Sequence, residues 1–78
     1  FSDELQTLVD KALETLPEQT RDIFIRSRYN NQSHKDIAEA LGVSTKTVEF
    51  HITKALKVLR IALKDYFPLL AFIPKLFY

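Results

Sequence analysis

The sequence predicts an all-α domain of four helices that is followed by an apolar C-terminal tail. Apolar residues recur at helical spacing in four segments, Pro17 and Gly42 separate segments, and no segment alternates apolar and polar residues as a strand does. The 78 residues suffice for one domain, and a composition of 46% hydrophobic and 27% charged residues is typical of a globular protein. We therefore assign residues 1–66 to the helical domain and residues 67–78 to the tail.

The first helix is expected to begin after Ser2, whose hydroxyl is in N-cap position. Asp3 and Glu4 follow in the first turn, where the helix dipole favours negative charge. The helix is expected to end before Pro17, because a proline ring prevents a helix from continuing. Its apolar stripe consists of Leu5, Leu8, Val9, Ala12, Leu13 and Leu16.

The second helix is expected over about residues 17–29, since proline is a favourable first residue of a helix. Its expected buried positions are Ile23, Phe24 and Tyr29. The polar segment that follows, residues 30–32, has no apolar periodicity and therefore predicts a loop.

A short third helix is expected over about residues 34–41. Ser33 and Asp36 have nearly the spacing of a capping box at its beginning. Gly42 predicts its end, because glycine enters the left-handed conformation of a C-cap without steric cost.

The fourth helix is expected to run from a cap at Ser44 to about Tyr66, a length of roughly 34 Å. Its apolar stripe consists of Val48, Ile52, Ala55, Leu56, Leu59 and Leu63.

Residues 33–57 are predicted to form a helix-turn-helix with Gly42-Val43-Ser44 as its turn. Ala38 leaves space for a close helix crossing, and Val48 points back into the angle between the two helices. The contact is completed by Ile37, Leu41, Val43 and Ile52. This arrangement is typical of the winged-helix-like DNA-binding superfamily, here without a wing. A purely structural helical hairpin has the same spacings and stays an alternative.

The outward face of the fourth helix has the residue types of a DNA-reading surface. It is made of Lys46, Glu49, Phe50, Thr53, Lys54 and Lys57. Lysines suit phosphates and guanine edges, Glu49 suits a cytosine amino group, and Thr53 or Phe50 suits a thymine methyl group. For the lysines, an ordinary solvated face is the alternative interpretation. Lys35, Ser44 and Thr45 lie at helix beginnings, where free backbone amides bind phosphate.

The charge distribution favours the same half of the chain for a polyanion partner. The formal net charge is only +1. Residues 1–32 nevertheless carry four basic against six acidic side chains, whereas residues 33–64 carry six basic against three acidic ones.

Other functional classes find little support in the sequence. The chain has no Cys, and its two histidines, His34 and His51, are seventeen residues apart on different predicted helices. There is no glycine-rich phosphate loop, so we predict neither an enzyme nor a bound metal or cofactor. No apolar run approaches the roughly 20 residues of a membrane span. Because the sequence begins with Phe1, we expect it to be part of a longer protein.

The apolar tail is expected to be buried. Pro68 and Pro74 interrupt it, which excludes a membrane helix. We expect the tail to pack on the domain itself or on a partner surface, with self-association as one form of the latter.

Taken together, the motifs resemble region 4 of extracytoplasmic-function (ECF) RNA polymerase sigma factors over about residues 8–60. The matching residues are Leu16-Pro17-Glu18, Arg21, Phe24, Ser33, Asp36-Ile37-Ala38, Leu41-Gly42-Val43-Ser44, Thr47-Val48, His51-Ile52, Ala55-Leu56 and Leu59-Arg60. The resemblance implies a cytoplasmic domain that binds double-stranded promoter DNA at the minus-35 element and the β flap of core RNA polymerase. An anti-sigma factor is a further implied partner.

Carried over position by position, the resemblance implies DNA contacts by Lys46, Thr47, Glu49, Phe50, Thr53 and Lys54. Glu49 and Phe50 depart from the basic or small polar residues that are frequent in the family, so the preferred base sequence does not carry over.

Two alternatives remain at this point. The output domain of LuxR-type response regulators shares Gly-Val-Ser, Thr-Val and the following His, but usually begins with Leu-Thr-x-Arg-Glu. Here Leu16-Pro17-Glu18 stands in that place. A helical protein-interaction domain is the second alternative.

Overall fold

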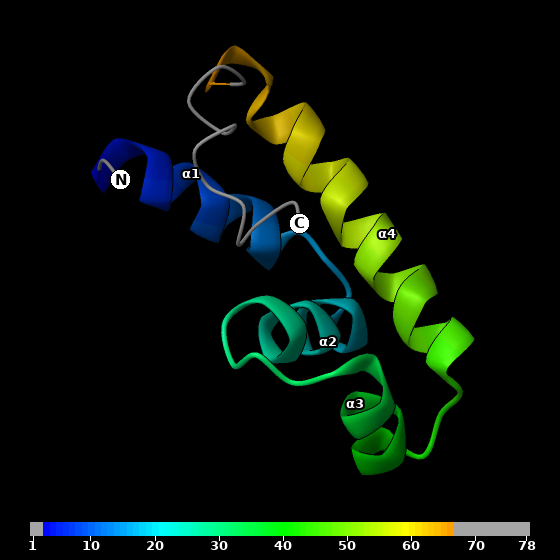
Figure 1. Cartoon of the computed structure of the whole chain (residues 1–78). Helices are drawn as coiled ribbons and strands as arrows, with labels where there is room; N and C mark the ends of the chain where they lie inside the picture. The colour runs from blue at the N-terminus through cyan, green and yellow to red at the C-terminus, as the bar shows by residue number, and fades with distance from the viewer. Residues whose placement is uncertain (1–2, 67–78) are drawn as a thin grey trace.

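The computed structural model describes residues 3–66, and these form an all-α fold without strands (Figure 1). The elements are α1 (Asp3–Glu14), α2 (Glu18–Arg28), α3 (His34–Leu41), α4 (Thr45–Ala62) and the 3₁₀ turn η1 (Lys64–Tyr66). The four expected helices are therefore confirmed. The expected cap at Ser2 and the apolar tail lie outside the described residues.

The longest helix, α4, is the common support of the domain. It packs against α1, α2 and α3, and α2 also packs against α3 (Figure 1). As Figure 1 shows, the C-terminal part of α4 lies on the side of α1, and its N-terminal part leads from the turn after α3. The other three helices therefore pack along the length of α4.

The apolar core consists of two clusters along α4. The first lies between α1 and the C-terminal half of α4, and contains Leu5, Val9, Ala12, Leu13, Leu16, Phe24, Ala55, Leu59 and Leu63. The second fills the helix-turn-helix corner, and contains Ile23, Ile37, Ala38, Val48 and Ile52. Leu56 packs against both clusters. The inward contacts predicted for Ala38 and Val48 are confirmed.

Side-chain caps fix the helix-turn-helix locally, as the sequence predicts. The Ser33 hydroxyl accepts the backbone N–H of Asp36 at 3.0 Å, which begins α3. Gly42 ends α3 with φ of 67°, in the left-handed region that glycine favours. The Ser44 hydroxyl accepts the backbone N–H of Thr47 at 3.1 Å, which begins α4.

The fourth helix is shorter than expected. It ends at Ala62, and the chain continues through Leu63, with φ of −109° and ψ of 16°, into the turn Lys64–Tyr66. Helices commonly tighten into a 3₁₀ turn at their C-terminal end, and Pro68 prevents α4 from continuing much further along the chain. The expectation of one helix up to Tyr66 was therefore wrong by one turn.

Tyr29 is the second correction, because it was expected to be buried and is 41% exposed. It is the C-cap of α2, one residue beyond Arg28, and its backbone N–H still donates to the Ile25 carbonyl. Its ring meets Phe24 edge-on, with centroids 6.5 Å apart. Partial burial first, and then Asp10, raise the pKa of Tyr29, while a hydrogen bond with Gln6 opposes the rise.

Candidate nucleic-acid interface

The structure places the predicted DNA-reading residues on one exposed face of α4. Val48, Ile52 and Ala55 are buried on the opposite side, so the roughly 100° turn per residue directs the intervening side chains outward. The exposed residues of this outward face are Lys46, Glu49, Phe50, Thr53, Lys54 and Lys57. We call this set the reader face.

The reader face is electropositive and carries one large apolar side chain. Over its whole length α4 has four basic residues and one acidic residue, Glu49. Phe50 is 62% exposed, and its ring touches that of His51 edge-on, with centroids 5.3 Å apart. A lysine-rich helix surface with an exposed aromatic ring has the chemistry to contact both phosphates and thymine methyl groups.

Two other predicted residues are engaged in holding the beginning of α4. Besides accepting from the Thr47 backbone, the Ser44 hydroxyl lies 3.0 Å from the Thr47 hydroxyl. Thr47 is half-buried, while Thr45 beside it is exposed. Ser44 and Thr47 therefore set where α4 starts, and with it the position of the reader face. Lys35 is exposed in the first turn of α3, on a different helix from the reader face.

The structure adds a contact that the sequence did not suggest. The Thr20 hydroxyl of α2 and Nδ1 of His51 on α4 are 2.9 Å apart and share a hydrogen bond. Thr20 is 0% exposed, and it is the one polar residue fully buried within residues 3–66. His51 is half-buried at the flank of the reader face. It thus borders the core and links α2 to α4.

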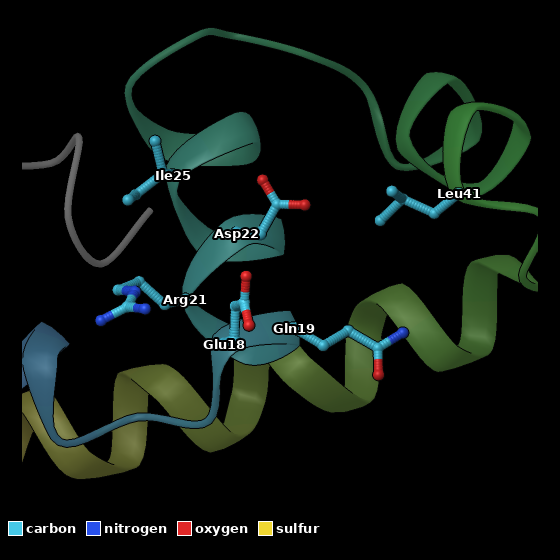
Figure 2. Close-up of a pocket in the computed structure, with 6 residues that line it drawn as sticks. All are labelled: Glu18, Gln19, Arg21, Asp22, Ile25 and Leu41. Atoms are coloured by element: carbon cyan, nitrogen blue, oxygen red, sulfur yellow. The ribbon is translucent and has the colours of Figure 1, made fainter.

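An open pocket lies between α2 and the end of α3 (Figure 2). It is lined by Glu18, Gln19, Arg21, Asp22, Ile25 and Leu41. Figure 2 shows Leu41 reaching into it from α3, whereas the other five side chains come from α2. Asp22 also pairs with Arg26 at 3.1 Å. The pocket combines half-buried apolar side chains with two carboxylates and one guanidinium.

The pocket changes where an apolar partner can bind. The apolar stripes of the first two helices are not available to such a partner. The structure buries those stripes in the domain's own core, with Val9, Ile23 and Phe24 fully covered. Ile25 and Leu41 remain partly accessible instead.

Residues 3–66 contain no group of three or more His, Cys, Asp or Glu side chains placed to hold a metal ion. In the same part of the chain, every helix is too short or too polar to cross a membrane.

The family described as "Sigma-70, region 4" matches residues 6–59, which includes all of α2 and α3 and most of α1 and α4. Neither a curated protein nor a solved structure matches significantly.

Proposed function

The chain belongs to the sigma-70 region 4 family, and from this premise we propose that α4 reads the minus-35 element of a promoter. Promoter recognition and binding to RNA polymerase come with the family in general, which is a DNA-binding regulatory family and not a catalytic one. The observation that supports the specific assignment is the reader face itself. It is exposed, basic and held by Ser44 at the beginning of a helix that follows a glycine turn.

Within this proposal the residues of the reader face have different tasks. Lys46, Lys54 and Lys57 neutralise phosphates, which provides affinity but little sequence preference. Glu49 accepts a hydrogen bond from a cytosine amino group, and Phe50 or Thr53 contacts a thymine methyl group. Lys35 and Thr45 contact the DNA backbone beside the groove.

We assign the second partner surface, the one for the β flap of RNA polymerase, to the pocket on α2. Its support is chemical. Ile25 and Leu41 form the apolar part of the pocket, and the carboxylates of Glu18 and Asp22 repel the phosphates of DNA. A short amphipathic segment of the polymerase would place an apolar side chain between α2 and α3.

The motif residues quoted above favour the ECF type, with an anti-sigma factor as regulator and the cytoplasm as the place of action. Polymerase association tests this against the alternatives. We expect the protein to bind core polymerase and to direct transcription that depends on it. Binding to palindromic half-sites as a symmetric dimer, without polymerase, would favour a LuxR-type regulator.

The reader face is tested by Lys46→Ala combined with Lys54→Ala. We expect weaker binding to promoter DNA and a smaller dependence on salt concentration in a gel-shift titration. Lys11→Ala is the matched control, since Lys11 is also exposed but lies on α1. If the double variant binds with unchanged affinity and salt dependence, α4 is not the reader.

A further inference from the structure

The hydrogen bond between Thr20 and His51 fixes a histidine at the edge of the reader face. Thr20 is completely buried in α2, so its hydroxyl has a fixed position. The bond joins residues 31 positions apart and crosses the contact between α2 and α4. A buried hydroxyl is costly without a partner, and His51 provides one.

This bond leaves the other ring nitrogen of His51 directed outward. The two nitrogens of an imidazole are separated by one ring carbon and point in clearly different directions, so Nε2 is directed away from Thr20 when Nδ1 points toward it. His51 as a whole is half-buried, so part of its side chain is accessible to solvent.

The direction of this hydrogen bond decides what Nε2 can do, because a threonine hydroxyl can either donate to Nδ1 or accept from it. In the arrangement in which the Thr20 hydroxyl donates to Nδ1, the proton of the neutral ring is on Nε2, which then acts as a donor. A phosphate oxygen is an acceptor, and a donor held in place by the protein is well suited to it.

His51 lies in a row with Lys54 of the reader face and with Thr47, for which the sequence resemblance implies a DNA contact. Thr47 precedes it by four positions and Lys54 follows it by three, so the three side chains are neighbours along one flank of α4. This flank faces α2, as the bond to Thr20 shows. A DNA strand that passes Lys54 on this side would come within reach of the outer edge of the His51 ring.

We propose that His51 is a further DNA-binding residue, which donates a hydrogen bond from Nε2 to a backbone phosphate, and that Thr20 is its positioning residue. This inference rests on the proposed function, since it requires that α4 lie on DNA. It adds a contact that depends on a buried residue of another helix.

The experiment uses the full chain and a duplex that the chain itself selects from a random-sequence pool. His51→Asn keeps an amide where Nδ1 lies but does not reach the place of Nε2, whereas His51→Gln reaches it. Thr20→Val removes the hydroxyl at nearly constant volume, and Thr20→Ser retains it. We expect His51→Asn and Thr20→Val to bind about three- to tenfold more weakly, the effect of one hydrogen bond, and His51→Gln and Thr20→Ser to retain more of the affinity.

Two measurements separate a DNA contact from a structural effect. Replacement of single phosphates by neutral methylphosphonates should identify one position that weakens the wild-type chain but not His51→Asn. Nitrogen NMR of the His51 ring should show the proton on Nε2 in the wild-type chain and a mixture of the two neutral forms in Thr20→Val.

The outcomes distinguish this inference from the proposed function. If the Lys46 and Lys54 variants weaken binding but His51→Asn, correctly folded by circular dichroism, binds like the wild type, the inference is wrong and the reader face stands. The same phosphate map for the wild type and His51→Asn would also overturn it. If the lysine variants have no effect, the proposed function itself fails.

Discussion

The hydroxyl of Ser44 accepts the backbone N–H of Thr47 at 3.1 Å and lies 3.0 Å from the Thr47 hydroxyl. This pair fixes the first turn of α4, and every residue of the reader face follows within the next thirteen positions. A change at Ser44 should therefore affect both the stability of the first turn of α4 and the position of the reader face.

Ser44→Ala should lower the free energy of unfolding by about 1 kcal/mol, because an N-cap side chain satisfies a backbone donor that otherwise has no partner. Urea denaturation measures the change. Thr45→Ala is a suitable control, since Thr45 is exposed and is not the cap residue. An equal loss in both variants would contradict a specific role of the Ser44 cap.

Gly42→Ala should destabilise the domain through its backbone and not through a clash. Gly42 has φ of 67°, and a Cβ added there would meet nothing within 4 Å. The left-handed conformation costs a residue with a side chain about 1–2 kcal/mol. Gly42→Asn should cost less, because asparagine adopts this conformation more readily. Thermal unfolding should therefore show that Gly42→Asn is more stable than Gly42→Ala. A steric clash would give the opposite order, because asparagine is larger than alanine.

Two substitutions on the reader face should have different consequences for DNA binding. Lys54→Ala should weaken binding to all sequences alike and reduce the slope of affinity against salt by about one, as for one lost phosphate contact. Glu49→Ala should instead change base preference, by about 1–3 kcal/mol at the contacted base pair. Binding titrations at several salt concentrations and on variant duplexes check both. A uniform effect of Glu49→Ala would contradict a base contact.

The raised pKa of Tyr29 predicts a loss of stability at high pH. The ordinary value is 10.0, and partial burial and Asp10 favour the neutral phenol in the folded state. Below pH 10 both states are neutral, so the contribution is fully present there. Above that value the unfolded chain ionises first, which favours unfolding. Urea denaturation at pH 9 and pH 11 should show a smaller decrease for Tyr29→Phe than for the wild type.

The apolar tail, residues 67–78, is predicted to be buried on the domain or on a partner. If it packs on the domain, ending the chain after Asp65 should lower the melting temperature of a monomer. If it forms an interface, the same truncation should abolish self-association or partner binding with little loss of monomer stability. Scattering and thermal unfolding distinguish the two results. A truncated chain that keeps both properties would contradict either form of burial.

The sequence predicted the helices because their ends depend on residues close together in the chain. It did not predict the contacts between residues that are far apart in the chain. Ser33, Gly42 and Ser44 each act on backbone groups within four residues, so the sequence alone indicated their roles. Tyr29 was misplaced because it lies five residues after Phe24, a spacing that does not return to the same face of a helix. The contact of Thr20 with His51 depends on how α2 crosses α4, and the pocket depends on Leu41 of α3 lying beside α2. Neither relation follows from the spacing of residues within one helix.

The division of the core into two clusters has a consequence for how the domain folds and opens. The corner cluster joins residues 23–52, whereas the other cluster brings residues 5–24 together with residues 55–63. Closing the longer loop costs more chain entropy, so the corner is favoured to form earlier and α1 to dock later. For the same reason, α1 is expected to detach from the native domain more easily than the helix-turn-helix unfolds. This partial opening leaves the helix-turn-helix assembled. Amide hydrogens of α1 should accordingly exchange sooner than those that join α3 to α4.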